Sequence, residues 1–173
     1  MKDKIFLLIE DIWDQIFCEK IIEPVLNNSY NAVLYYKYIK KRKERVGNFI
    51  KGLISDGKDY IILGDLDEKN NIIVAKEYIY DRTNKLADKN FIHIVIKEIE
   101  SWIIAGLDEE IISRYDITLN INNTEIYSKE DFIKIIPKNQ TPNIFMNAVL
   151  ETYELEKAKL RNNSFNNFII TIS

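Results

Sequence analysis

Few residues in this sequence are of the kinds that stabilise secreted proteins or anchor a chain in a membrane. A single cysteine, Cys18, excludes an internal disulfide and fits a reducing compartment, so we expect a cytoplasmic protein. The apolar run Ile5–Ile9 is broken by Glu10 and Asp11, and it is too short for a secretory signal. Since no apolar stretch approaches the roughly 18 residues of a membrane span, we expect no transmembrane segment.

Charge of one sign is lacking too. There are 24 Lys and Arg against 27 Asp and Glu, a formal net charge of −3, so no strong overall field draws the chain to nucleic acid. The sequence has only 5 glycines and 3 prolines, and it contains no flexible linker, repeat or low-complexity tract. Its 173 residues, 46% apolar and 29% charged, predict a globular chain with one core.

What the sequence does contain is an alternation of strand-like and helix-like segments. Apolar runs predict strands at Lys4–Ile9, Tyr30–Tyr38, Lys58–Gly64 and Phe91–Ile96. Residue spacing and position between strands predict helices at Ile12–Leu26, Lys40–Ser55, Ile72–Arg82, Glu98–Ala105 and Glu109–Tyr115. The β-branched run Ile72–Arg82 also fits a strand, and its position between strands favours a helix. We expect an α/β fold with a mostly parallel sheet of about four strands flanked by helices.

Beyond residue 116 the pattern changes. The segment DITLNINNTEIY is polar and β-like, whereas Ser128 with an aspartate three residues later predicts a helix start. Thr141 followed by proline predicts another helix, which we expect to continue through TPNIFMNAVLETYELEKAKL. We therefore expect a first domain at residues 1–116 and a C-terminal helical extension at residues 117–173 that packs on the same domain.

Acidic residues follow three of the predicted strands. The first strand ends at Glu10, the third at Asp65 and Asp67, and the fourth runs into Glu98 and Glu100. An isolated Asp-x-Asp is common in solvated turns, but parallel sheets bind ligands beyond the carboxyl ends of their strands, where neighbouring strands would bring these acids together. Clustered carboxylates raise one another's pKa unless a cation neutralises them. The sequence therefore predicts a site for Mg²⁺ or Mn²⁺ at this edge of the sheet.

The remaining reactive side chains fit structural roles better. His93 lies in an apolar strand, and Cys18 lies inside a helix with no histidine nearby in the sequence. Trp102 is expected to pack in the core. No glycine-rich phosphate loop of the P-loop type is present, which excludes nucleotide hydrolysis by that route.

Two motifs resemble those of the TOPRIM domain family. The segment LLIEDIWD is similar to the first TOPRIM motif, in which a glutamate ends the first strand; Glu10 matches that glutamate and Asp14 a later aspartate. The segment ILGDLDE resembles the second motif, Asp-x-Asp, through Asp65 and Asp67. The resemblance extends over residues 4–108 and implies a TOPRIM-like (Rossmann-like) fold.

A third segment, IVIKEIESWIIAGLD, is similar to a stretch of small stand-alone TOPRIM-like proteins of prokaryotic defence and mobile loci. In those proteins an acid pair precedes a tryptophan, and Glu98, Glu100 and Trp102 match. Two positions depart from the family pattern. Asp11 stands where a glycine usually follows the first glutamate, and Gly106 stands where the small defence proteins usually carry an aspartate.

The resemblance implies Mg²⁺-dependent phosphoryl transfer on nucleic acid, and we expect a nuclease of a prokaryotic antiviral defence system. Asp65 and Asp67 are the expected metal ligands, and Glu10 is expected to bind the ion or to act as general base through water. Glu98 and Glu100 are expected to hold a second ion or to orient the first, with Glu100 favoured as the one facing the site. The resemblance also implies a separately encoded partner, an ABC-type or related ATPase.

A basic cluster follows the second predicted strand and is the candidate contact for nucleic acid. It fits a solvated helix start, and it also fits a surface that follows a phosphate backbone; its members are Lys40, Lys41, Arg42, Lys43 and Arg45. The apolar C-terminal segment FNNFIITIS is expected to dock on a partner chain, because its large side chains need cover.

Two other functions stay open at the level of sequence. A non-catalytic TOPRIM-fold module that binds a partner protein or nucleic acid is favoured by Asp11 and Gly106, and a primase or other nucleotidyl transferase is disfavoured by the short chain. Titration with Mg²⁺ separates the first alternative from a nuclease, because a catalytic site gains thermal stability from the ion. The sequence does not determine the oligomeric state, nor whether the substrate is DNA or RNA.

Overall fold

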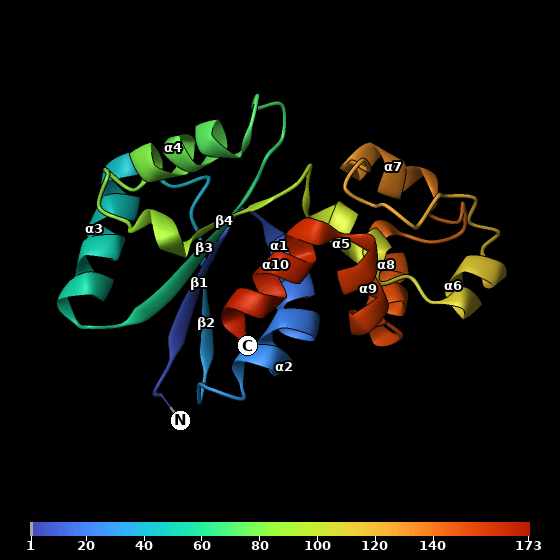
Figure 1. The fold of residues 1–173 in the computed structure, drawn as a ribbon, viewed down its shortest axis with the longest axis horizontal. Coiled ribbons are helices and arrows are strands. Elements are labelled where there is room, and N and C mark those ends of the chain that lie inside the picture. The colour runs from blue at the N-terminus through green and yellow to red at the C-terminus, as the bar shows by residue number, and fades with distance from the viewer. Residues whose placement is uncertain (1) are drawn as a thin grey trace.

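A four-stranded parallel sheet forms the centre of the computed structural model, which describes residues 2–173. Its strands are β1 (Ile5–Ile9), β2 (Val33–Lys37), β3 (Asp59–Asp65) and β4 (Ile92–Val95). They lie in the spatial order β2-β1-β3-β4 (Figure 1), which confirms the expected α/β fold. Because the chain first adds a strand on one side of β1 and then on the other, the carboxyl ends of β1 and β3 form the switch point where such sheets bind ligands.

Alternate residues of the strands face two separate cores. On β1, Leu7 and Leu8 belong to different cores, as the two-residue period of a strand requires. The smaller core lies beneath α3 (Lys43–Ser55) and α4 (Ile72–Arg82), which cover one face of the sheet (Figure 1). The ambiguous segment is thus a helix, and the side chain of Asn71 caps its start.

The larger core lies on the opposite face, and its cover includes the first helical segment. That segment consists of α1 (Ile12–Phe17), the π-helical turn η1 (Cys18–Ile22) and α2 (Glu23–Leu26). The sequence predicted one uninterrupted α-helix here. Because Pro24 has no N–H to continue the α-helical pattern, the wider turn accommodates it, with the N–H of Glu23 donating to the carbonyl of Cys18.

The helices α5 (Ile99–Ala105) and α6 (Glu109–Arg114) follow β4 as predicted. Residues 116–127 form turns and irregular chain, so the expectation of a β-like segment is wrong. A strand is stable only beside another strand, and this segment bonds to a helix end instead. The hydroxyl of Thr124 accepts a hydrogen bond from the side-chain amide of Asn162 at 3.0 Å.

Three further helices follow: α7 (Lys129–Lys134), α8 (Pro142–Glu151) and α9 (Leu155–Arg161). The predicted capping box at Ser128 opens α7. The single helix predicted from Thr141 is wrong, because the chain breaks between α8 and α9 at Tyr153. Its ring packs against Gly106, and its hydroxyl donates to the carbonyl of Trp102 at 2.7 Å. A continuous helix would withdraw Tyr153 from this contact.

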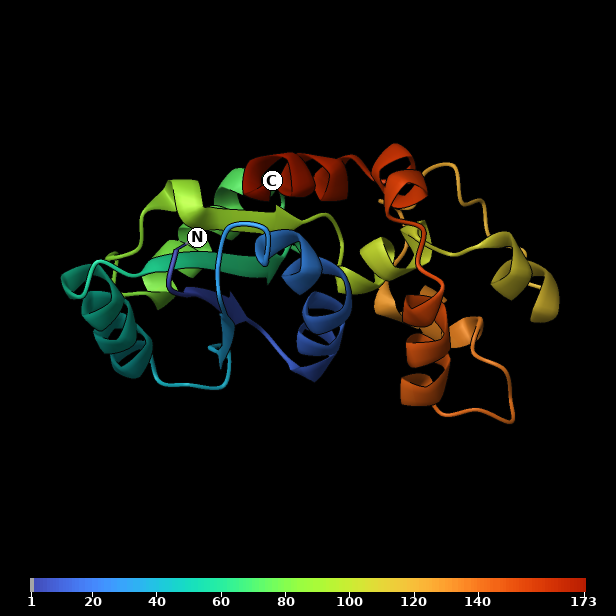
Figure 2. The ribbon, with the colours of Figure 1, turned by 90° about the horizontal axis from the view of Figure 1, so that it is seen from below.

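The last helix, α10 (Asn163–Ile172), packs on the same face of the sheet as α1 (Figures 1 and 2). Phe165, Phe168 and Ile169 are 0%, 2% and 4% exposed, and the two phenylalanine rings pack against Trp102. These three side chains therefore find the expected cover within the chain, whereas Ile170 is 66% exposed. Docking of this segment on a partner chain stays a prediction. Among residues 2–173, no helix is long and apolar enough to cross a membrane.

Candidate functional site

The carboxyl ends of β1 and β3 border a small acidic cleft of about 240 Å³. Glu10 follows β1 directly and Asp65 is the last residue of β3, and these strands are neighbours in the sheet. The backbone N–H of Asp65 donates a hydrogen bond to Oε1 of Glu10 at 3.3 Å. All five carboxylates singled out from the sequence line the cleft: Glu10, Asp65, Asp67, Glu98 and Glu100.

Glu10 is fixed by contacts from two strands besides its own. The hydroxyl of Tyr38, a fully buried residue just after β2, lies 3.1 Å from Oε1 of Glu10 and donates to it. The absence of a side chain at Gly64 makes room for this pair, because a Cβ there would lie 2.8 Å from the Tyr38 hydroxyl and 3.2 Å from Oε1 of Glu10. Burial raises the pKa of Glu10 to about 7, and the nearby charge of Asp14 adds to the effect.

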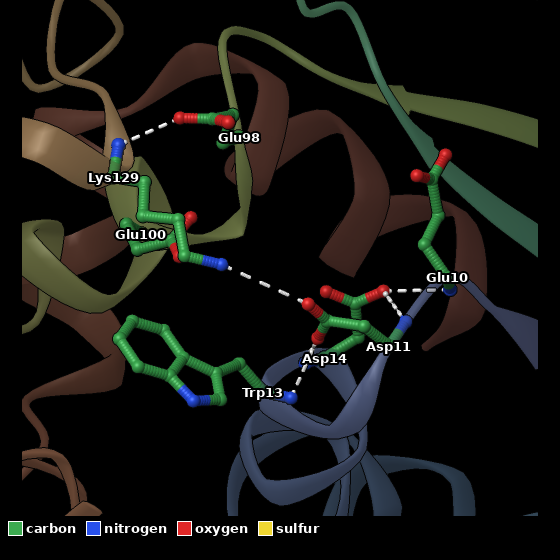
Figure 3. A network of polar contacts seen from close by, with 7 residues as sticks. All are labelled: Glu10, Asp11, Trp13, Asp14, Glu98, Glu100 and Lys129. Carbon is green, nitrogen blue, oxygen red and sulfur yellow. Dashed lines mark hydrogen bonds and ion pairs between the residues drawn. The ribbon is translucent and has the colours of Figure 1, made fainter. Parts of the chain in front are cut away.

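Asp11 and Asp14 fix the start of α1 (Figure 3). The Asp11 carboxylate accepts from the N–H of Trp13 at 2.7 Å, and Oδ2 of Asp14 accepts from the N–H of Glu10 at 2.7 Å. Asp11 has a φ of −138°, so the position does not need the glycine that the TOPRIM family usually has there. Burial raises the pKa of Asp14 to about 6. Sequence reasoning left Asp14 out of the site, although its spacing from Glu10 had matched the motif.

The two aspartates of the Asp-x-Asp segment differ in their surroundings. Asp65 is held within the cleft, and burial, followed by the charges of Asp14 and Glu10, raises its pKa well above the usual value. Asp67 lies beyond the end of β3 in a left-handed conformation with a φ of 47°. Its carboxylate accepts from Nζ of Lys69 at 2.7 Å. The chain therefore leaves the strand conformation between Asp65 and Asp67, and a turn places Asp67 in the lining of the cleft.

Glu98 and Glu100 stand at the start of α5. Glu98 is the N-cap residue, and Glu100 lies in the first turn with 2% of its surface exposed. Burial raises the pKa of Glu100 to about 7, while the charge of Lys129 acts in the opposite direction. Nζ of Lys129 lies 3.7 Å from Oε1 of Glu100 and 3.8 Å from Oδ2 of Asp11 (Figure 3). Lys129 comes from α7, and no local pattern in the sequence linked it to these acids.

The chemistry of the cleft fits a hard divalent cation, because the carboxylate oxygens that line it are the ligands that Mg²⁺ prefers. Burial is the main cause of the raised pKa values of Glu10 and Asp65, and the charges of neighbouring acids add to it. Within residues 2–173, however, no three acidic, histidine or cysteine side chains enclose a common point suited to an ion. Two carboxylates pair with lysines instead, Asp67 with Lys69 and Glu100 with Lys129.

The basic cluster lies beside the cleft only in part. Lys40 lines the cleft, whereas Lys43 forms an ion pair with Asp81 at 2.7 Å. The loop that carries Lys40 is held by Arg82, whose guanidinium donates to the carbonyls of three loop residues, Tyr38, Ile39 and Lys41. Arg82 was not identified from the sequence, where it appears only as the last residue of a helix.

Gly106, the second departure from the TOPRIM pattern, has a steric cause. A Cβ at this position would lie 2.1 Å from Cε2 of Tyr153, so a larger residue cannot be accommodated without moving the ring. Asp108 lies two residues further on and caps α6 through the N–H of Ile111 at 2.7 Å. Asp108 therefore has a structural role here.

One solved structure shares the fold. The chain superposes on the C-terminal region of the Burkholderia pseudomallei OLD protein with a TM-score of 0.51 and 12% sequence identity, covering 98% of each chain. No protein-family model matches the sequence. No curated protein matches it either.

Proposed function

We propose that the protein is a Mg²⁺-dependent nuclease that hydrolyses phosphodiester bonds in DNA or RNA. The observation that carries this proposal is the meeting of five carboxylates in one cleft at the switch point of the sheet. Burial raises the pKa of Glu10, Asp65 and Glu100, which means that their charged forms are disfavoured. A bound divalent cation would stabilise these charged forms. The likeness in fold to the OLD C-terminal region, which is TOPRIM-like, supports the same class of reaction.

The proposal assigns different roles to the acidic residues of the cleft. Asp65 and Asp67 are assigned to hold the ion, which when bound polarises the scissile phosphate and neutralises charge on the leaving oxygen. Glu10 is assigned to take the proton of the attacking water, since a general base works best with a pKa near the working pH, and that of Glu10 is about 7. The hydrogen bond from Tyr38 fixes Oε1 of Glu10, so Oε2 is the oxygen assigned to the water.

Binding of nucleic acid is assigned to the basic cluster, which offers few side chains for contacts with phosphates. Lys40, Lys41, Arg42 and Arg45 remain for phosphates, because Lys43 is engaged with Asp81. With a net charge of −3 the chain binds long nucleic acid weakly by itself. The proposal therefore includes recruitment by a larger partner within a prokaryotic defence system, an ABC-type or related ATPase. This partner rests on the TOPRIM resemblance alone.

A second candidate function is a non-catalytic TOPRIM-fold module that binds a partner protein or nucleic acid. The observation that favours it is the pairing of Asp67 with Lys69 and of Glu100 with Lys129, which gives these acids an internal counter-charge. A module of this kind would bind no divalent ion and would cleave nothing.

The test is cleavage of labelled single- and double-stranded DNA and RNA with Mg²⁺ or Mn²⁺, using Asp67→Asn. Asparagine tolerates the left-handed conformation of Asp67, so the substitution removes charge without backbone strain. We expect cleavage to fall about a hundredfold or more, because losing an ion ligand costs several kcal/mol of transition-state stabilisation.

The matched control is Asp116→Asn, at an exposed position with a φ of 50°. This variant should cleave as the wild type does. Equal activity in Asp67→Asn and the wild type would show that Asp67 is no ligand. A wild-type chain that neither binds Mn²⁺ nor cleaves any of the four substrates would favour the non-catalytic module.

A further inference from the structure

Lys129 lies beside some of the acids that line the cleft and apart from Glu10 (Figure 3). The carboxylate of Glu10 points away from Lys129, whereas Asp11 and Glu100 flank its ammonium. Nζ of Lys129 lies 3.8 Å from Oδ2 of Asp11 and 3.7 Å from Oε1 of Glu100. A positive charge therefore already stands between two carboxylates that come from the starts of two different helices, α1 and α5.

Three contacts hold Lys129 in this place. Its backbone N–H donates to Oε2 of Glu98 at 2.6 Å, which fixes the start of α7 against the start of α5. Its ammonium lies 4.6 Å from the centre of the Trp13 ring, a favourable cation–π position. The capping box at Ser128 fixes the backbone just before it. The side chain is 38% exposed, so its charge remains accessible from the cleft.

A divalent ion that bridged Asp11 and Glu100 would have to occupy the space of this ammonium and would neutralise the same two carboxylates. Two cations so close together repel each other strongly, and a half-buried site screens that repulsion poorly. Glu100, at 2% exposed, obtains its counter-charge from Lys129 without any ion.

We propose that Lys129 takes the place of a second divalent ion, so that the cleft binds a single ion on the side of Asp65 and Asp67. The bound phosphate then meets one metal ion and one ammonium group. This inference deepens the proposed nuclease function and rests on it for the identity of the phosphate. The number of ions can be measured without any cleavage.

The experiment is isothermal titration calorimetry of the full chain with MnCl₂, on the wild type and on Lys129→Met, Lys129→Gln and Lys129→Arg. Lys134→Met is the matched control, because Lys134 lies on the same helix and pairs with Asp131 outside the cleft. Circular dichroism checks that each variant is folded. We expect a single Mn²⁺ per chain in the wild type, Lys129→Arg and Lys134→Met, and a second Mn²⁺ in Lys129→Met and Lys129→Gln.

The other outcomes overturn the inference in distinguishable ways. Two ions in the wild type, or the same number in the wild type and in both neutral variants, would show that Lys129 replaces no ion, while the nuclease proposal would stand. A second ion in Lys134→Met as well would show a general effect of net charge. No ion in the wild type would overturn the nuclease proposal together with the inference.

Discussion

At the scale of single residues, Gly64 shows how little free space the site contains. Three side chains pack close to Gly64 in β3: Tyr38 and Glu10 from the ends of β2 and β1, and Ile79 from α4. A Cβ there would lie 2.3 Å from Cδ1 of Ile79, which real structures do not tolerate without movement. The glycine before the Asp-x-Asp segment is therefore needed for close packing around the Glu10 carboxylate.

We expect Gly64→Ala to destabilise the protein by about 1–3 kcal/mol, the usual cost of overpacking a core. It should also impair cleavage by displacing Tyr38 from Glu10. Urea unfolding followed by circular dichroism measures the first effect. Gly52→Ala is the control, because no atom lies within 4 Å of a Cβ at that position in α3, and alanine should stabilise the helix there. An unchanged midpoint in Gly64→Ala would contradict the steric role.

At the scale of elements, the alternation of apolar segments was enough to predict every strand and most helices. The errors arose where contacts between distant segments decide. The break at Tyr153 depends on its contact with Gly106, and the irregular chain at residues 116–127 depends on the absence of a strand partner for it within the described fold. The internal cover of the C-terminal helix α10 was not foreseen, because Trp102 and its neighbours lie more than sixty residues earlier in the sequence.

The basic element before and within α3 should give the isolated chain weak, salt-sensitive binding to duplex DNA. With about four phosphate contacts, log K should fall with log salt with a slope of about −3 to −4. Fluorescence anisotropy of a labelled duplex over a salt series measures it. Arg45→Gln should reduce the slope by about 1, and the exposed Lys51→Gln, later on the same helix, should not change it. Tight binding with a much steeper slope would make a nucleic-acid-binding partner unnecessary.

At the scale of the whole molecule, the sequence predicted most of the acids that line the cleft but not the other residues that surround them. The rule that parallel sheets bind ligands at their carboxyl ends identified five of the seven carboxylates that line the cleft and left out Asp11 and Asp14. Tyr38 and Lys129 could not be predicted, because they reach the site from the residue after β2 and from α7 through tertiary packing. The patterns beside them in the sequence, a helix start at Ser128 and a basic cluster from Lys40, do not point to the cleft.

The raised pKa values predict that metal-free protein loses stability as the pH rises. The folded state binds more protons than the unfolded state between about pH 4.5 and 7, because the pKa values of Glu10 and Glu100 rise from 4.5 to about 7. The free energy of unfolding should therefore fall through this window, by on the order of 3 kcal/mol for Glu100 alone. Burial lowers the pKa of His93 to about 4, which gives a smaller slope of opposite sign below about pH 6.5.

Thermal unfolding in EDTA at pH 5.5 and pH 8 tests this prediction. The Tm should be lower at pH 8, and Mg²⁺ should restore it by binding the folded state. Glu100→Gln should flatten the profile, since it removes one of the raised carboxyls while leaving His93 in place. The exposed Glu44→Gln serves as control and should follow the wild type. A Tm in EDTA that rises from pH 5.5 to pH 8 would show that the pKa values of Glu10 and Glu100 are not raised in the folded protein.

The position of Lys129 has a consequence for how such chains can change in evolution. Its ammonium stands between acids from α1 and α5, and the aromatic residues of α10 fill the core beside Trp102. Recombination near residue 116 would therefore give a hybrid whose sheet lacks the cover that α10 supplies and whose cleft lacks the charge of Lys129. We therefore expect the two parts of the chain to be inherited together, and we expect substitutions at Lys129 to occur together with substitutions at Asp11 and Glu100.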